Sequence, residues 1–325
     1  MHTIRAEGIN DAFVEGWWAL RTNGQPELSE RGPVLAMPGP VCTEYSDPRK
    51  RVLFSERRDA NPVFHLMEAI WMLAGSNDVR FLEQFNSGYR NYADPGTDVV
   101  WGAYGNRWRY VDTSPGMASM DQLKMLVYLL TENPLSRRAV LSMWDPVLDL
   151  GTDHADRPCN LNCMFDCRGG VLNMTVTCRS NDMLWGAYGA NVVHFSMLQE
   201  WMAAALKMPI GVYRQFSNNF HVYTDNEMVK SFIVSPQGEY EGSYPTIIPM
   251  VQPGASADDF LEDCEKLVTD PKSFSFKSYF ISEVAHPLML AYLDRKAGKP
   301  WNVNYVPNCD WKQAFLEWVD RRAKK

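Results

Sequence analysis

The sequence predicts an α+β fold, with one principal domain and an appended C-terminal part, on three observations. Two segments place apolar residues at helical spacing, a later region alternates apolar and polar residues as strands do, and no low-complexity linker divides the 325 residues. The composition, 46% hydrophobic and 22% charged, is that of an ordinary globular chain. It excludes disordered, collagen-like and coiled-coil proteins.

Residues 62–74 and 193–206 are the two helical segments. Their apolar positions are Phe64, Met67, Ile70, Trp71 and Ala74 in the first, and Phe195, Leu198, Trp201, Met202 and Leu206 in the second. Side chains at this spacing share one face of a helix, so we expect both segments to be core helices.

The region from Leu161 to Cys178 has the pattern of a β-hairpin with one buried face. Apolar and polar residues alternate on both sides of a turn at Arg168, Gly169 and Gly170. The apolar positions are Leu161, Cys163, Phe165 and Cys167, and then Leu172, Met174, Val176 and Cys178.

The weakest boundary in the chain lies near residues 235–258, where Gly, Pro and Ser concentrate. We therefore expect a principal domain over residues 1–230 and a C-terminal extension over residues 231–325, packed on that domain or continuing it. The extension contains FLEDCEKL and QAFLEWVDRR, which are typical of amphipathic helices. One short motif occurs twice, as WGAYGN at 101–106 and as WGAYGAN at 185–191. Two copies are too few for a repeat fold, and they indicate two glycine turns with aromatic anchors.

A net charge of -7 argues against binding of duplex DNA through a broad basic face, because phosphate neutralisation needs clustered lysines and arginines. Any anionic ligand should be small and held by local arginines. No apolar run approaches the roughly 18 to 20 residues of a membrane span, and the start MHTIRAEGIN has no signal-peptide pattern. We therefore expect a cytoplasmic protein with no direct nucleic-acid or membrane partner.

Cys159 is the first candidate for chemistry among seven cysteines, which we expect to be reduced. Pro158 breaks the preceding segment and leaves Cys159 at the mouth of the hairpin, where a thiol can be reached. A nucleophilic thiolate needs nearby positive charge, and Arg137, Arg138 and Arg179 can supply it. A plain structural cysteine is the alternative.

The other hairpin cysteines, Cys163, Cys167 and Cys178, fall on the apolar face, where cysteine behaves as a small hydrophobic residue. A metal site is not expected. Cys159, Cys163 and Cys167 are spaced by fours, and on a strand this spacing puts successive sulfurs roughly 13 Å apart, too far for one zinc ion.

Several motifs, in order, resemble the thymidylate synthase superfamily, including its bacteriophage branch of deoxypyrimidine nucleotide hydroxymethylases. The resemblance runs from about Arg31 to Tyr223, which is most of the chain. It rests on HLMEAIWMLAGSND at 65–78, WGAYGNRWR at 101–109, NPLSRRAVLSMW at 133–144, RPCN at 157–160, CRSND at 178–182 and NNFHVYTDN at 218–226. Each motif is weak alone, and together at family spacing they are specific.

The resemblance implies the family's fold, a large mixed β-sheet covered by helices, in a homodimer that packs through its sheets. It also implies a phosphate site made by Arg179 and Ser180 of one subunit and by Arg137 and Arg138 of its partner, with Arg31 as a further donor. Planar guanidinium groups suit a phosphate monoester dianion.

The remaining roles that the resemblance implies concern the nucleoside. The catalytic residues would be Cys159, Glu68, Tyr104 and Asp182. His221 and Tyr223 would bind the sugar hydroxyls, Asp182 would lie near the pyrimidine ring, and Glu68 would organise water above it. The co-substrate would be 5,10-methylenetetrahydrofolate, and no metal is expected.

The implied mechanism begins when Cys159 adds to C6 of the pyrimidine, which makes C5 nucleophilic enough to take up the one-carbon unit of the folate. Loss of the C5 proton and of the folate leaves an exocyclic methylene on the covalently held ring. Hydride from the folate would then give a methyl group, whereas water delivered under Glu68 would give a hydroxymethyl group.

Three departures from the synthase pattern favour hydration. Tyr89 and Tyr92 stand where synthases carry a pair of tryptophans, the first of which shields the methylene from solvent. Asn160 stands where a histidine commonly follows the catalytic cysteine. The hydrophobic tail that closes the synthase pocket has no counterpart in QAFLEWVDRRAKK, and the chain continues for about 100 residues past Asn226.

The base is read in the family by an asparagine that pairs with uracil or by an aspartate that suits cytosine. One inserted residue in WGAYGAN places Asn191 there, and no insertion places Ala190 there. A glycine loop absorbs an insertion better than a helix does, so we favour Asn191 and uracil. Asn191 as a plain helix N-cap is the alternative, which leaves cytosine open.

We therefore expect a deoxyuridylate (dUMP) 5-hydroxymethylase whose ligands are a pyrimidine nucleoside monophosphate and a reduced folate. The enzyme alternatives are a deoxycytidylate (dCMP) 5-hydroxymethylase and a thymidylate synthase. An inactive family member that binds a nucleotide without turnover is the alternative of another class. The presence of Cys159, Glu68 and the four arginines speaks against it.

Overall fold

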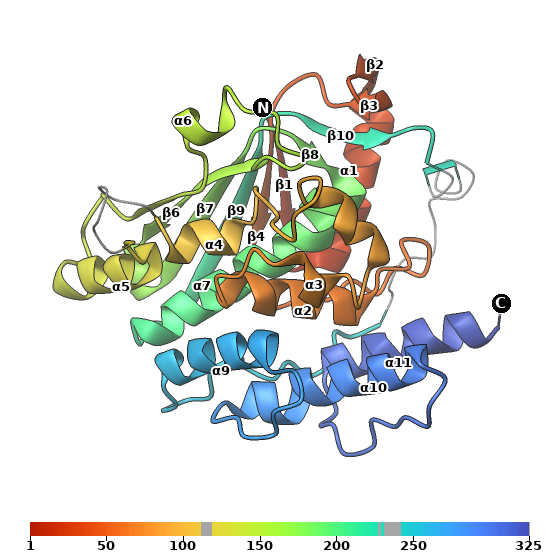
Figure 1. Ribbon diagram of the computed structural model, residues 1–325. Coiled ribbons are helices and arrows are strands. Elements are labelled where there is room, and N and C mark those ends of the chain that lie inside the picture. The colour runs from red at the N-terminus through yellow and green to blue at the C-terminus, as the bar shows by residue number, and fades with distance from the viewer. Residues whose placement is uncertain (112–118, 227–228, 231–241, 325) are drawn as a thin grey trace.

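The computed structural model describes residues 1–111, 119–226, 229–230 and 242–324. Its centre is a six-stranded mixed sheet in the order β1-β4-β9-β7-β6-β5 (Figure 1). The strands are β1 (His2–Ala6), β4 (Val41–Tyr45), β9 (Ile210–Ser217), β7 (Leu172–Cys178), β6 (Asn160–Asp166) and β5 (Val140–Ser142). The pairs β1-β4 and β7-β9 are parallel, and the other neighbours are antiparallel. The α+β class predicted above is confirmed.

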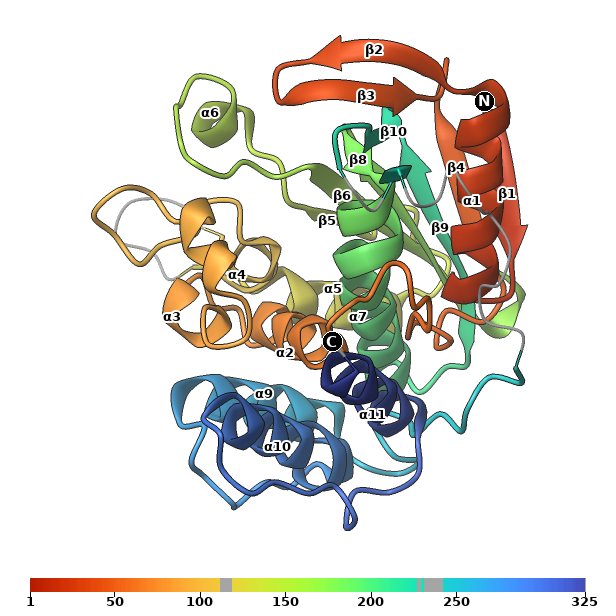
Figure 2. The same cartoon turned by 90° about the vertical axis from the view of Figure 1, so that its right-hand side faces the viewer.

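A second sheet of four strands lies at one end of the first, in the order β2-β3-β10-β8 (Figure 2). It consists of β2 (Gln25–Ser29), β3 (Gly32–Ala36), β10 (Phe220–Tyr223) and β8 (Asn181–Asp182). Strand β10 follows β9 after two residues, and β8 follows β7 after two residues, so the two sheets meet where these strands end. This junction brings residues 178–182 beside residues 217–221.

Helices cover one face of the six-stranded sheet. Helix α7 (Asn191–Ala205) crosses β7 and β9, and α1 (Ile9–Asn23) packs on β1 and β4 (Figure 2). Helix α2 (Pro62–Leu73) lies on α7, away from the sheet. The smaller helices on this side are α3 (Val79–Leu82), α4 (Tyr104–Arg109), α5 (Gln122–Glu132) and α6 (Pro146–Asp149), with a 3-10 turn at Ser87–Tyr92 and a π-helical segment at Met183–Ala190 that runs into α7. Both core helices predicted from the apolar spacing are confirmed, within one or two residues.

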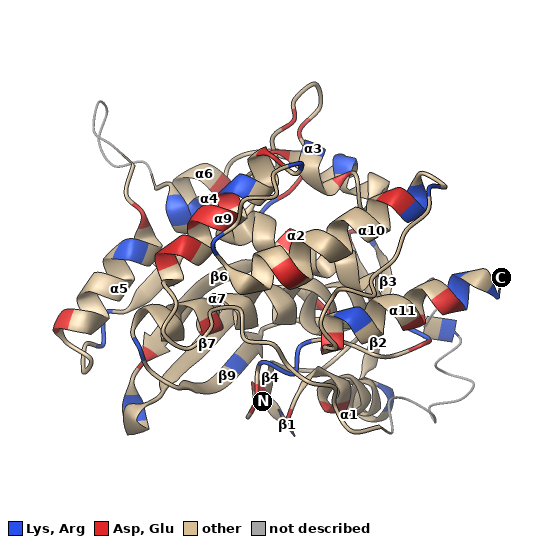
Figure 3. Ribbon diagram, turned by 90° about the horizontal axis from the view of Figure 1, so that it is seen from below, with Lys and Arg blue, Asp and Glu red and all other residues tan. Residues whose placement is uncertain are grey.

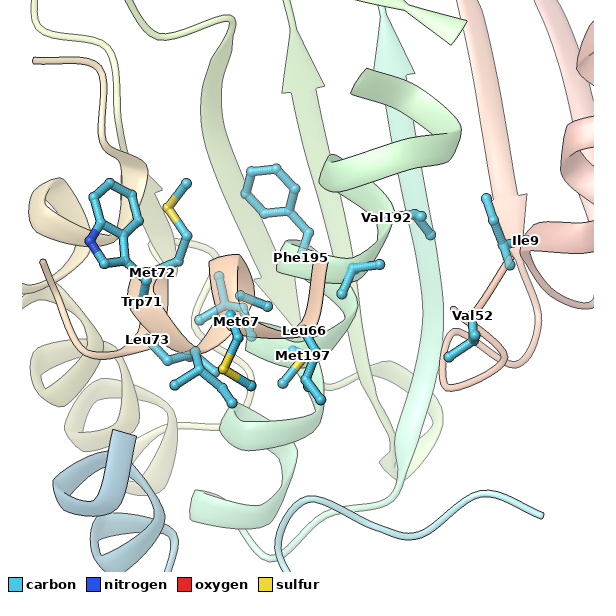
Figure 4. Packing of buried hydrophobic residues seen from close by; sticks show 14 of the residues in the cluster. Ile9, Val52, Leu66, Met67, Trp71, Met72, Leu73, Val192, Phe195 and Met197 are labelled. Carbon is cyan, nitrogen blue, oxygen red and sulfur yellow. The ribbon is translucent and has the colours of Figure 1, made fainter. Parts of the chain in front are cut away.

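Asn61 and Pro62 set the start of helix α2. The side chain of Asn61 accepts a hydrogen bond from the Phe64 amide, and Pro62 occupies the first turn, where a missing N–H costs nothing. All but one of its twelve residues are buried, because α7 covers one side and C-terminal helices cover another. Figure 4 shows its side chains Leu66 and Met67 gathered beside Met197 of α7.

The C-terminal part consists of α9 (Ala257–Thr269), a π-helical turn at Ile281–Ala285, α10 (His286–Lys296) and α11 (Asp310–Ala323). All three helices contact α2, and Figure 3 shows basic and acidic residues interspersed along them. Arg321 and Arg322 bind the Asp59 carboxylate just before α2, and the Tyr292 hydroxyl donates to the Phe85 carbonyl at 2.9 Å. The two predicted amphipathic helices are confirmed. The domain boundary stays a prediction, since residues 231–241 lie outside the described residues.

The predicted hairpin is also confirmed. Strands β6 and β7 are antiparallel and joined by a short turn at Arg168–Gly170. Cys163, Val176 and their cross-strand neighbours Leu141, Gln215 and Thr43 form one buried row across the sheet. The residues between them point to the opposite face, where exposed side chains include Arg5 on β1, Met164 on β6 and Val140 on β5.

None of the helices in the described ranges is long and apolar enough to cross a membrane.

The glycines of the repeated WGAYG motif lie where another residue approaches closely. A Cβ built on Gly105 would lie 1.9 Å from the carbonyl oxygen of Met72 in α2, and one built on Gly186 would lie 2.5 Å from the Asn181 side-chain oxygen. The aromatic anchors differ in environment. Tyr104 lies at the start of α4 beside Cys159, while Tyr188 is buried and hydrogen-bonded to Thr43.

Replacement of Gly105 by alanine should destabilise the fold by at least about 2 kcal/mol, because the new methyl group meets backbone that belongs to α2 and cannot rotate away. The matched control is Gly151→Ala, where a Cβ would have nothing within 4 Å. Urea unfolding of the two variants measures the difference. Equal stabilities would show that α4 and α2 are less tightly packed than described.

Candidate active site

Cys159 lies between Pro158 and the first residue of β6, with its side chain partly exposed. Its backbone is held on two sides. The amides of Cys159 and Asn160 donate to the Tyr104 hydroxyl at 3.3 and 3.5 Å, and the Arg179 amide donates to the Cys159 carbonyl at 2.8 Å. Tyr104 and Arg179 therefore fix the position of the thiol from two different elements.

The charges around Cys159 set it apart from the other hairpin cysteines. The pKa of its thiol is raised overall, because burial and Asp156 raise it more than Arg179 and Arg31 lower it. At Cys163, burial alone raises the pKa far above its usual value. A cysteine with two guanidinium groups in reach can be activated, whereas one sealed in the core cannot. The geometry thus favours Cys159 as the nucleophile.

Glu68 and the two tyrosines lie on the same side of the site as Cys159. Glu68 is buried on α2, and burial together with the nearby Glu68 carboxylate raises the pKa of Tyr89 well above its usual value. Tyr92 lies within electrostatic reach of both Glu68 and Cys159, and its ring centre is 5.2 Å from that of Tyr89. Tyr89 is 9% exposed and Tyr92 is 42% exposed, so one ring is part of the core and the other faces solvent.

A ladder of buried amides connects Asn160 to the start of α7. The Asn160 side chain donates to the Asn191 side-chain oxygen at 3.1 Å, and Asn191 donates to the Asn181 oxygen at 3.1 Å. Asn181 then donates to the Ser217 hydroxyl at 2.9 Å. Asn191 already has helical backbone angles and follows the N-cap residue Ala190, so the alternative that it is the N-cap is wrong.

Asp182 and His221 lie opposite each other in the parallel pair β8-β10. Asp182 Oδ1 accepts from the Trp185 amide at 2.7 Å, while its Oδ2 is buried without a hydrogen-bond partner in the described part of the chain. Burial raises the pKa of Asp182 and lowers the pKa of His221. Tyr223 follows on the same strand, 5.3 Å from the His221 ring centre, and lines a cavity of about 400 Å³ together with Arg31.

The predicted phosphate ligands fall into two groups. Arg31, Arg179 and the half-buried Ser180 lie on the side of Cys159, and the Arg179 Nε donates to the Pro158 carbonyl at 3.0 Å. Arg137 and Arg138 are exposed, just before the edge strand β5. In the described part of the chain, the arginines that lower the pKa of Cys159 are Arg179 and Arg31.

Two residues near the site were not predicted from the sequence. His194 on α7 is buried, and its Nε2 lies 3.0 Å from Glu68 Oε2. It follows Asn191 by three positions, so the helical spacing alone places both on one face.

The second residue is Asp156, whose charge raises the pKa of Cys159, Tyr89 and Tyr92. It lies close to Gly102, where a Cβ would be 2.3 Å from the Asp156 Oδ2. Burial raises the pKa of Asp156 to about 6.

The thymidylate synthase family model matches residues 56–238 of the chain, which contain most of the residues described above. The chain belongs to the thymidylate synthase family. A deoxyuridylate hydroxymethyltransferase of Pseudomonas phage M6 is 38% identical over 339 aligned residues, which cover 99% of this chain and 95% of that relative.

Two further relatives match a smaller share. A deoxyuridylate hydroxymethyltransferase of Bacillus phage SP01 is 37% identical over 61% of this chain and 53% of its own length. A thymidylate synthase of Equine herpesvirus 2 (strain 86/87) is 33% identical over 52% of this chain and 57% of its own length. The chain is a transferase of this family, and its relatives include both hydroxymethyltransferases and synthases.

We expect Cys159→Ser to abolish turnover while nucleotide binding survives, because the phosphate and base contacts do not involve the sulfur. Cys163→Ser should cost about 1 to 2 kcal/mol of stability through a buried hydroxyl but leave turnover measurable. Product formation and equilibrium binding of dUMP measure the two effects. Equal loss of activity in both folded variants would contradict the assignment of the nucleophile.

Proposed function

We propose that this protein is a deoxyuridylate 5-hydroxymethylase, which transfers a one-carbon unit to C5 of dUMP and hydrates it. The observation that supports hydration most is the pair Tyr89 and Tyr92, which puts polar rings beside Glu68 and Cys159. The phage relatives named deoxyuridylate hydroxymethyltransferases support the same conclusion. Because those relatives belong to bacteriophages, we further propose that the enzyme acts in the cytoplasm of an infected host.

In the proposed reaction, the Cys159 sulfur adds to C6 of the base and makes C5 a nucleophile. The co-substrate, 5,10-methylenetetrahydrofolate, supplies the one-carbon unit. Asp182 is suited to hold a bound ligand, because its Oδ2 is a buried acceptor that an N–H group of the base or the folate can satisfy. Tyr104 keeps the nucleophile in place through its two backbone contacts.

The amide ladder supports uracil as the base. With one contact to Asn160 and one to Asn181, Asn191 keeps one N–H and one oxygen lone pair free. Uracil presents a matching acceptor and donor at O4 and N3. Turning Asn191 alone to suit cytosine, in which donor and acceptor are exchanged, would set nitrogen against nitrogen at Asn160 and oxygen against oxygen at Asn181.

A homodimer is part of the proposal. The face of the six-stranded sheet opposite α7 has exposed side chains on β1, β5 and β6, and a second copy packed there would cover them. Arg137 and Arg138 lie at the β5 edge of this sheet. We propose that they reach the phosphate of the partner's nucleotide, where Arg179 and Ser180 bind it from the other side, with His221 and Tyr223 on the sugar.

With dUMP and methylenetetrahydrofolate, the main product should be 5-hydroxymethyl-dUMP, and the folate should leave as tetrahydrofolate. The physical reason is that the exocyclic methylene meets water before hydride. Mass spectrometry identifies the nucleotide, and near-ultraviolet absorbance reports dihydrofolate, which should scarcely form. Dihydrofolate produced in step with dTMP would show a thymidylate synthase instead, and no release of the C5 proton would show an inactive nucleotide-binding protein.

The same assay tests the base. When dUMP and dCMP compete, dUMP should be used at least about tenfold faster, and Asn191→Asp should shift the preference toward dCMP, because a carboxylate accepts from the cytosine amino group. Asn173→Asp is a suitable control, since Asn173 lies on β7 away from the ladder. A wild-type preference for dCMP would mean that Asn191 does not read the base as proposed.

Subunit mixing tests the shared site. Cys159→Ser and Arg138→Ala dimers should each be inactive, and after exchange of subunits the mixture should recover roughly a quarter of wild-type activity, since one hybrid site in two contains neither lesion. Exchange is verified by native mass spectrometry of differently tagged subunits. Proven exchange without recovery would mean that Arg138 serves the site of its own chain.

A further inference from the structure

We propose that His194 is a positioning residue that holds the water molecule which hydrates the exocyclic methylene, together with Glu68. The inference rests on the proposed hydroxymethylase function and names the water site within it. It starts from a contact between two buried polar side chains of α7 and α2 that no hydrogen bond explains.

His194 Nε2 lies 3.0 Å from Glu68 Oε2, and the side chains are only 2% and 5% exposed. The two atoms are not aligned for a direct hydrogen bond. Glu68 Oε2, His194 Nε2 and His194 Nδ1 are all buried without a hydrogen-bond partner in the described ranges. Leaving such groups unpaired costs about 1 to 3 kcal/mol each, so we expect a small polar molecule to one side of the pair, within hydrogen-bond reach of both side chains.

The residues around the Glu68–His194 pair relate it to the proposed active site. Glu68 raises the pKa of both Tyr89 and Tyr92, and Cys159 raises that of Tyr92, so the carboxylate and the thiol are near the same pair of rings. His194 lies one helical turn after Asn191, the residue proposed to read the base. A water held by both side chains would therefore lie beside Glu68, one helical turn from the residue proposed to read the base.

The donors and acceptors match a single water molecule. The Nε2–H of His194 donates to the water oxygen, and the water donates one hydrogen to Glu68 Oε2. One lone pair of the water stays free for the exocyclic carbon. Without the imidazole, the water would be held at one point only and could turn that lone pair away.

The step balances without another reactant. The water oxygen bonds to the exocyclic carbon, and one water proton passes to Glu68. The electron pair of the exocyclic double bond moves into the ring, and departure of the Cys159 thiolate from C6 restores the C5–C6 double bond. His194 neither gains nor loses a proton in this scheme, so it acts through the orientation of the water.

A single-turnover experiment with enzyme in excess separates this role from a structural one. Release of tritium from [5-³H]dUMP reports the steps before the methylene, and mass spectrometry reports 5-hydroxymethyl-dUMP. In His194→Ala, tritium release should stay within about twofold of wild type while hydroxymethylation falls about 100-fold, the loss expected when a reacting group is misplaced by about 1 Å. The methylene adduct on Cys159 should accumulate and be detected as added mass on the intact protein.

Two conservative variants keep the test decisive if the alanine variant does not fold. The amide nitrogen of glutamine reaches the place of Nε2, whereas that of asparagine reaches only the place of Nδ1. His194→Gln should therefore keep hydroxymethylation within about tenfold of wild type, and His194→Asn should lose it like alanine. His286→Gln is the matched control, because His286 is also buried but lies in α10.

The inference is overturned if tritium release falls as much as hydroxymethylation in the folded His194 variants, or if the asparagine variant is as active as the glutamine variant. A wild-type enzyme that makes dTMP and dihydrofolate overturns the proposed function itself. That result is read from the wild type alone and is distinct from a failure confined to His194.

Discussion

The site depends on the packing of α2 between α7 and the C-terminal helices. An apolar helix covered on these sides leaves Glu68 as its single acidic residue in a place without bulk water. A carboxylate there is tolerated only if other groups replace its hydration, and each unpaired oxygen is costly. Tyr89 and His194 are the groups that lie beside it, so the same packing that stabilises the fold creates the polar pair at the centre of the proposed chemistry.

The C-terminal extension also supports the packing of α2 and α7. Besides the Asp59 ion pairs, a buried pair of Arg51 and Glu200 meets the backbone of Met250, whose amide donates to Glu200 at 2.9 Å. Such a pair fixes geometry more than it adds stability, because both charges lose their water. The extension thereby holds α2 and α7 from outside. A chain without it would expose the apolar outer face of α2 and lose the rigid support behind Glu68.

The local spacing of apolar and polar residues predicted these helices and strands well, because α2, α7 and the β6-β7 hairpin each carry a complete apolar face in sequence. It also singled out Cys159, since a proline before a strand is a local signal. His194 and Asp156 were missed for the opposite reason. A histidine inside an apolar helix is ambiguous until its neighbour across the fold is known, and Asp156 acquires meaning only where residues 89–92 and Gly102 come beside it. The amide ladder likewise joins four separate segments, and no spacing within any one of them predicts it.

The choice between hydration and reduction follows from what surrounds a methylene attached to a ring on Cys159. An apolar lid would protect it until hydride arrives. Here the inner ring, Tyr89, is fixed by its contacts with Phe64 and Trp71, while the outer ring, Tyr92, is open to solvent. Asp156 adds a carboxyl group whose pKa burial raises to about 6. Polar groups such as these keep water near the proposed site. A water already ordered beside Glu68 can react without any part of the protein opening first.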